Sequence, residues 1–414
     1  MPSSMSGCAQ KIWSVRSNNH LQITTQKATI PLMKYLVSTF VILVICSCSI
    51  FAQQKDQTRL SDTLKNYSAY KRKLSFAGVL QTRYVLALDK NIDINGKNFN
   101  PDASKAVTNS FLVKRARIMV KGDINDHFSA NILANLAEFN SDPTNKVLEN
   151  AYIKYSLNQY FHIQAGQFRP FFGIEDVMAV DIIRTLDFSN QYYAFGKNGW
   201  QSFQTGLSVF GNVIPGGKIR YFAGTYNGNN KNQSTDDNNT KNLYARLETD
   251  LIKDFTLGLN AGTGSLASSS IGQAYGADAT AKITLSKKFD ILLMAEYKKG
   301  ANFLAYNADK QVVRPDLTEY QMQGFYFFPT LRYNHQSRRL RAVEFSCRYE
   351  YFDENYKLAS NPRQTLIPNV SLIFADDFYA ALQVGVAIDR FKNQVPLTTT
   401  YSRNLGYVQL QIRF

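Results

Sequence analysis

The chain has 414 residues, of which 47 are Lys or Arg and 32 are Asp or Glu, for a formal net charge of +15. Charged residues make up only 19% and aromatic residues 13%, a composition that excludes a disordered chain. The mean hydropathy of −0.27 excludes a bundle of membrane helices, each of which would need about 20 consecutive apolar residues. Four Cys residues are too few for a disulfide scaffold.

Residues 1–52 have the pattern of a secretory signal peptide. Lys34 precedes an apolar run that ends in the small residue Ala52, and this run is too short for a transmembrane anchor. We expect cleavage after Ala52 and a true start at Met33. Removal of this segment leaves 43 basic and 32 acidic residues, a formal charge of +11, with Cys347 as the single remaining Cys.

The polar residues 53–72 are expected to form a short periplasmic segment, either helical or without regular structure. From residue 73 to the end, apolar and polar residues alternate with a period of two, which predicts strands with one apolar and one wet face. About sixteen such segments follow, most of them longer than strands of soluble sheets and close to the roughly 9–11 residues that cross a bilayer. They cover approximately 74–88, 108–121, 127–140, 146–157, 160–168, 200–211, 217–227, 241–250, 255–266, 272–285, 288–299, 318–333, 340–352, 363–374, 378–390 and 402–414.

In the second of these segments, Lys114 interrupts the apolar face that we assign to Leu112, Ala116, Ile118 and Val120. A lysine on that face indicates a β-bulge or an interfacial strand end.

The connections between the segments alternate in length. Short turns at one rim and long loops at the other are typical of outer-membrane barrels, whereas sandwiches and propellers have no reason for such sorting. Closure is required because lipid offers no hydrogen-bond partner to an unpaired strand edge. We therefore predict an all-β protein in the bacterial outer membrane, a transmembrane antiparallel β-barrel over residues 73–414. The terminal strand ends on Phe414, which resembles the signal read by the outer-membrane assembly machinery.

The loop 169–199 is the longest and carries unusually many apolar residues for an exposed loop. We predict that it folds into the barrel and narrows the pore. The basic residues of the loop would then lie opposite its acidic residues at the constriction. These acidic residues are Glu175, Asp176, Asp181 and Asp187. The alternative is an external loop that packs on neighbouring loops or on a partner subunit.

Basic residues on the wet face of the strands and in this loop are the candidate pore-lining and anion-binding residues. A positive lining attracts anions, and a low-dielectric wall focuses its field. The alternative is that these bases pair with Glu149, Glu248, Glu344 or Glu350 and brace the wall. The candidates are Arg115, Arg117, Lys154, Arg169, Arg184, Lys197, Arg220, Arg246 and Arg348.

Three stretches, 111–122, 165–173 and 199–206, resemble the phosphate-selective porin O and P family. The resemblance implies a sixteen-stranded, usually trimeric barrel with a basic lumen that passes anions. Members of the family vary in selectivity, so the resemblance does not identify the solute.

We predict an outer-membrane porin for passive diffusion of small hydrophilic solutes, biased toward anions of the phosphate or polyphosphate class. The alternatives are a non-selective general porin, an adhesin or structural barrel, and an outer-membrane phospholipase. A phospholipase would need a His/Ser pair on adjacent strands, and the sequence shows none. We expect no catalysis, no cofactor, no metal centre and no nucleic-acid binding; the expected partners are small anions, membrane lipid with lipopolysaccharide, and the assembly machinery. Residues 91–102 partly resemble a calcium loop, with Asp102 where a Glu normally closes the site.

Overall fold

The computed structural model describes residues 73–414 except 98, 100–105, 141–145, 180–182, 234, 268–269, 336, 376–377 and 394–402. The predicted signal peptide, the start at Met33 and the periplasmic segment therefore lie outside the described residues. Asp102 and Asp181 do as well.

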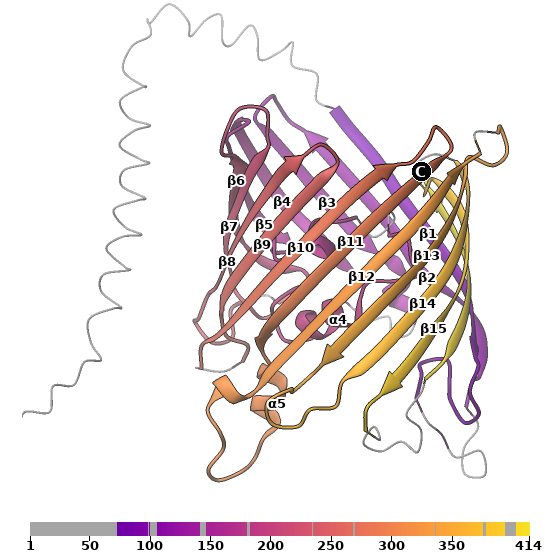
Figure 1. Ribbon diagram of the computed structural model, residues 1–414. Helices are drawn as coiled ribbons and strands as arrows, with labels where there is room; N and C mark the ends of the chain where they lie inside the picture. The colour runs from indigo at the N-terminus through magenta and orange to yellow at the C-terminus, as the bar shows by residue number, and fades with distance from the viewer. Residues whose placement is uncertain are drawn as a thin grey trace, which may run out of the picture. The chain divides into compact units, whose positions relative to one another are not determined.

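The described residues form a closed barrel in which each strand pairs antiparallel with its neighbours in the chain (Figure 1). β1 completes the circle by pairing with β16, from Val79 opposite Arg413 to Ala87 opposite Leu405. The strands are β1 (Lys73–Ala87), β2 (Asn109–Asp123), β3 (Phe128–Asn135), β4 (Leu148–Asn158), β5 (Phe161–Phe168), β6 (Gln204–Asn212), β7 (Ile219–Tyr226), β8 (Asn242–Ile252), β9 (Phe255–Gly264), β10 (Gly272–Thr284), β11 (Phe289–Ala301), β12 (Gln321–Asn334), β13 (Ala342–Asp353), β14 (Arg363–Ala375), β15 (Ala380–Phe391) and β16 (Leu405–Arg413). The prediction of sixteen antiparallel strands is confirmed.

Short helical segments lie in the connections: η2 (Leu136–Asn140), α3 (Ile174–Val177), α4 (Asn190–Lys197), α5 (Phe303–Ala308) and η4 (Leu317–Glu319). Within the described part of the chain, no helix has both the length and the apolar character to cross a membrane.

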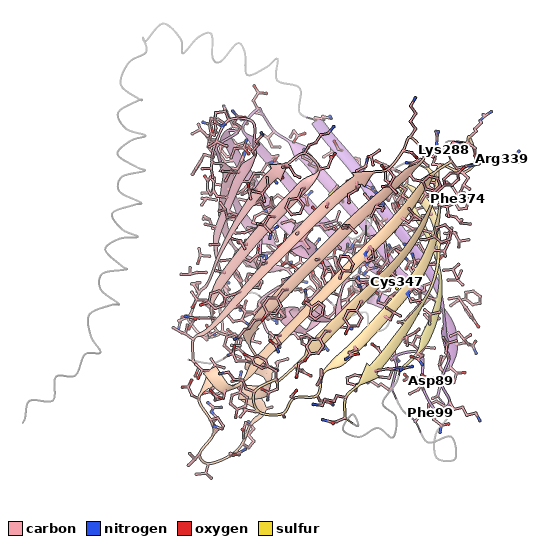
Figure 2. The ribbon with its side chains drawn as sticks, in the orientation of Figure 1. Asp89, Phe99, Lys288, Arg339, Cys347 and Phe374 are labelled. Carbon is pink, nitrogen blue, oxygen red and sulfur yellow. The ribbon has the colours of Figure 1, made fainter. Side chains whose placement is uncertain are left out.

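The two rims of the barrel differ as the loop lengths predict. The short turns lie at the rim that holds the C-terminus, and the long loops with α5 lie at the opposite rim (Figure 1). Figure 2 shows Lys288 and Arg339 at the first rim, Asp89 and Phe99 at the second, and Cys347 in the wall between them.

β13 shows how alternation in the sequence becomes two faces of the wall. Glu344, Arg348 and Glu350 are almost completely buried toward the interior, whereas Phe345 leaves 53% of its surface exposed on the outside. Apolar outward residues are favourable where lipid replaces water, and inward residues can stay polar.

A bulge in β2 accounts for Lys114. Gln81 of β1 pairs with Arg115 while the next residue, Thr82, pairs with Val113, so Lys114 is the extra residue. Lys114 and Arg115 can therefore both point inward, and the predicted bulge is confirmed. Because of the extra residue, the residues of β2 that precede Lys114 point to the opposite face from the one that simple alternation predicts. Leu112 pairs with Arg83, whose side chain is buried inside the barrel. The assignment of Leu112 to the outward face is therefore wrong.

Phe414 closes the barrel seam. Its backbone N–H donates to the Gly78 carbonyl over 3.1 Å, and the Gly78 N–H donates to the Phe414 carbonyl over 2.7 Å. A Cβ at position 78 would come within 2.2 Å of the Phe414 ring, so a larger residue there would require the ring to move. The role of Phe414 as an assembly signal stays a prediction.

Candidate pore constriction

The segment 169–203 between β5 and β6, here called the constriction loop, folds into the lumen. α4 lies inside the barrel (Figure 1), and several hydrogen bonds tie the loop to distant strands. Arg348 of β13 donates to the Asp187 carbonyl over 2.7 Å, Gln191 donates to Glu296 of β11 over 3.2 Å, and Trp200 donates to the Ala301 carbonyl over 2.9 Å. The predicted infolding is confirmed, and the alternative of an external loop is wrong.

Aromatic packing holds the loop against the side of the barrel from β7 to β13 and against α5. Phe172, Phe195 and Trp200 are completely buried in one apolar cluster with side chains of the wall. The ring of Trp200 stacks on Phe303 with centroids 5.3 Å apart, and Phe172 meets Tyr244 edge-on at 5.7 Å. Burial of such a side chain is worth about 1.5–3 kcal/mol, so the apolar content of the loop anchors it in place.

Gly173 lets the loop approach β11 closely. Its φ is +126°, and a Cβ there would lie 2.2 Å from Oε1 of Glu296 and 2.4 Å from Nζ of Lys298. The next residue, Ile174, donates its backbone N–H to the same Glu296 oxygen over 3.0 Å. Glycine at this position therefore sets the depth of the loop in the lumen.

We expect Gly173→Ala to displace the constriction loop, because both the backbone angle and the space disfavour a Cβ. The variant should show a higher single-channel conductance and lose ~1–3 kcal/mol of stability. Gly196→Ala is the matched control: it lies in α4 of the same loop, and the nearest atom to its new Cβ would be 3.7 Å away. Equal conductance of the two variants would contradict the positioning role of Gly173.

Asp187 stands at the centre of the charge arrangement. Arg83, Lys114 and Arg115 approach its carboxylate to 3.3, 3.0 and 2.6 Å, and the Tyr193 hydroxyl donates to it over 2.6 Å. Burial opposes ionisation, but the three cations hold the pKa of Asp187 well below its usual range. Three cations around one carboxylate leave a local excess of positive charge. Arg83, Lys114, Arg115 and Asp187 are here called the Asp187 cluster.

Most of the predicted pore-lining residues are paired with carboxylates. The pairs include the four glutamates named in the bracing alternative, whereas the pore-lining and anion-binding roles of these bases stay predictions. The pairs are Arg115–Asp187, Arg117–Glu149, Arg184–Glu344, Arg220–Glu248 and Arg220–Asp250, Arg246–Glu248 and Arg246–Asp278, and Arg348–Glu350.

The other three predicted residues have different surroundings. Arg169 donates to the carbonyls of Glu175 and Met178, over 2.9 and 3.2 Å, and to no carboxylate among the described residues. Lys154 in β4 and Lys197 at the end of α4 form no ion pair within the described ranges. These three cations therefore keep their charge uncompensated by a direct carboxylate contact.

Sequence reasoning missed Arg83, Arg363 and Arg403. Arg83 alternates with apolar residues in β1 and could have been found by parity, since Gln81 and Val85 share its face. Arg363 pairs with Asp389 at the loop end of β14, and Arg403 stacks over the ring of Phe391 at 4.6 Å. Neither of these contacts can be read from strand parity.

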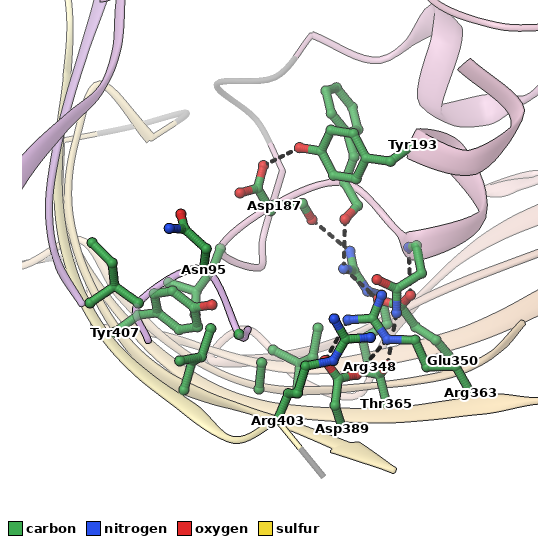
Figure 3. Close-up of a pocket in the computed structure, with 18 of the residues that line it drawn as sticks. Asn95, Asp187, Tyr193, Arg348, Glu350, Arg363, Thr365, Asp389, Arg403 and Tyr407 are labelled. Atoms are coloured by element: carbon green, nitrogen blue, oxygen red, sulfur yellow. Dashed lines mark hydrogen bonds and ion pairs between the residues drawn. The ribbon is translucent and has the colours of Figure 1, made fainter. Parts of the chain in front are cut away.

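The constriction loop has a cavity on each side, and both are lined by an excess of cations. The outer chamber, of about 230 Å³, lies toward the long loops (Figure 3). The inner chamber, of about 500 Å³, lies toward the short turns. Four cations and three carboxylates line the outer chamber: Arg83, Arg348, Arg363 and Arg403 with Asp187, Glu350 and Asp389. Four cations and one carboxylate line the inner chamber: Arg117, Lys154, Arg169 and Arg413 with Asp176.

Residues 86–249 match the family model described as phosphate-selective porin O and P. This match shows a similarity to that family over less than half of the chain. It spans β2 to β8 and the whole constriction loop, and it confirms the resemblance seen in the sequence motifs. A comparison with curated proteins finds no match.

Solved structures similar to this chain are outer-membrane barrels. An anion-selective porin from Comamonas acidovorans has a TM-score of 0.54 at 10% identity, covering 83% of this chain and 99% of its own. The outer membrane channel DcaP of Acinetobacter baumannii has a TM-score of 0.53 at 14% identity, with 83% and 97% covered. The trimer form of OmpT from Vibrio cholerae has a TM-score of 0.50 at 11% identity, with 83% and 100% covered. At these identities the likeness shows the fold alone.

Proposed function

We propose that this outer-membrane porin passes small hydrophilic solutes by passive diffusion with a bias toward anions. The family and the fold favour a channel rather than an enzyme. The observation that carries the anion bias is the Asp187 cluster, in which three cations surround one carboxylate at the constriction loop. A general porin without bias would be expected to balance these charges.

The constriction loop and the two chambers have different roles in this proposal. The constriction loop narrows the lumen, and the cationic excess of both chambers lowers the energy of an entering anion while repelling cations. The carboxylates that accompany the arginines keep each site from holding an anion too tightly, since conduction requires release as well as binding. Anions would thus pass from one cationic region to the next.

We propose phosphate-type anions as solutes, because guanidinium groups can grip a phosphate through two parallel hydrogen bonds. The purified protein in planar bilayers should show stepwise chloride conductance, and added phosphate should reduce it by competing for the arginines. Conductance steps that phosphate does not reduce would indicate a general anion porin without a preference for phosphate. The absence of any conductance would contradict the porin function and favour the adhesin or structural barrel.

The protein is further proposed to act as a homotrimer, as the trimer form of OmpT does. Sedimentation equilibrium in detergent should then give three times the mass of the mature chain. A single-chain mass over the whole accessible concentration range would contradict this assembly.

A further inference from the structure

We propose that the inner chamber is a binding subsite for small organic anions with an aromatic body, of which benzoate is the simplest. The inference rests on the proposed function, because such anions would reach the chamber through the pore. It adds a class of solute that differs from inorganic anions in having an apolar part. The outer chamber also contains aromatic rings, those of Phe188, Tyr193 and Tyr407, but its cations are accompanied by three carboxylates.

The inner chamber has the size and lining of a small-molecule site. Its volume of about 500 Å³ falls within the range of roughly 300–1,000 Å³ that is typical of ligand pockets, which combine apolar walls with a few placed polar groups. It is bounded by strands at the β1–β6 side of the barrel, by β16 and by the first part of the constriction loop.

One wall of the chamber is a row of aromatic rings. Tyr152 meets Phe168 edge-on with centroids 5.8 Å apart, Phe168 lies 6.4 Å from Phe171, and Phe171 lies 5.4 Å from Phe210. Tyr152, Phe171 and Phe210 are only partly buried, so they still present ring surface to the chamber. An aromatic guest can therefore extend the row by an offset or edge-to-face contact.

Cations stand beside this aromatic wall. Lys154 follows Tyr152 by two residues on β4, so both side chains lie on the same face of the strand. Lys154 has no ion-pair partner in the described part of the chain, and Arg169 is held by two backbone carbonyls. Asp176 is the one carboxylate in the lining, and its side chain is held by Gln201 over 2.6 Å.

An aromatic wall next to an uncompensated ammonium group matches a molecule with a ring at one end and a carboxylate at the other. Chloride or acetate can bind to the cations, but contact with the rings adds nothing to its affinity. Benzoate can use both, and removal of its ring from water adds to its affinity. The chamber should therefore distinguish benzoate from acetate, although the two carry the same charge.

The test measures how benzoate and acetate reduce the chloride conductance of the purified protein in planar bilayers. We expect benzoate to halve the conductance at a concentration about tenfold lower than acetate, because of its buried ring. Equal concentrations for the two anions would overturn the proposal.

Two variants assign the effect to the chamber. Phe210→Leu keeps an apolar side chain but removes a ring, and it should weaken block by benzoate while leaving block by acetate unchanged. Phe345→Leu is its matched control, since Phe345 lies on the outer face of β13. Lys154→Gln should weaken block by both anions, whereas Lys287→Gln, on the exposed turn between β10 and β11, should change neither. A Phe210→Leu variant that shifts both anions equally would overturn the role of the rings.

Equilibrium dialysis of labelled benzoate against the protein in detergent separates this proposal from the porin function. Bound benzoate that is displaced poorly by acetate, in a protein that conducts no ions, would support the subsite and contradict the porin function. A conducting protein that binds benzoate no better than acetate would contradict the subsite and leave the porin function intact.

Discussion

Asp187→Asn should increase the anion preference of the pore. The substitution keeps the size of the side chain but removes the one negative charge that Arg83, Lys114 and Arg115 share. We expect the chloride-to-potassium permeability ratio, measured from the reversal potential in a KCl gradient, to rise roughly threefold or more. The difference from the wild type should persist at about pH 5, because the three cations hold the pKa of Asp187 well below its usual range, despite burial, and keep it ionised.

Asp237→Asn is the matched control for this experiment. Asp237 lies exposed in the loop between β7 and β8, so its loss removes the same charge far from the Asp187 cluster. Its permeability ratio should equal that of the wild type. If Asp187→Asn leaves the ratio unchanged or shifts it toward potassium, the Asp187 cluster does not set the selectivity.

The double variant Arg115→Ala with Arg117→Ala should have the opposite effect and lower the anion preference. It removes two cations from β2 and leaves Glu149 inside the barrel without its partner at 2.7 Å. The permeability ratio should fall roughly threefold or more, and the unpaired carboxylate should cost about 3–5 kcal/mol of stability. The two readouts are the reversal potential and the temperature at which the barrel unfolds in detergent.

Arg338→Ala with Arg339→Ala removes the same total charge from the exposed turn between β12 and β13. Figure 2 shows Arg339 at the rim of the barrel. This control should change neither the ratio nor the unfolding temperature by a comparable amount. An unchanged reversal potential in the Arg115 and Arg117 variant would remove these two residues from the selectivity of the pore.

The wall of this barrel could be predicted from sequence because its physics is local. A strand with lipid on one side and water on the other must alternate, and lipid allows no unpaired edge, so alternation and loop lengths together predict a closed barrel. The error at Leu112 has the same origin. A single extra residue, Lys114, reverses the parity, and parity counted from the far side of a bulge assigns the wrong face.

The sequence predicts that the loop 169–199 folds into the pore, but it does not predict which residues the loop contacts. The apolar content of the loop indicated that it buries itself, and the structure confirms this with Phe172 and Trp200. Which base meets which acid depends on where the infolded loop touches strands far away in sequence. Asp187, for example, meets Arg83 and Arg115 only because the loop crosses to the β1–β2 wall.

The reversal potential of the wild-type protein in a planar bilayer between concentrated and dilute KCl tests the central claim most directly. The cationic excess around Asp187 and in both chambers predicts a reversal potential displaced toward the chloride equilibrium potential. A reversal potential displaced toward the potassium equilibrium potential would contradict the anion-biased porin.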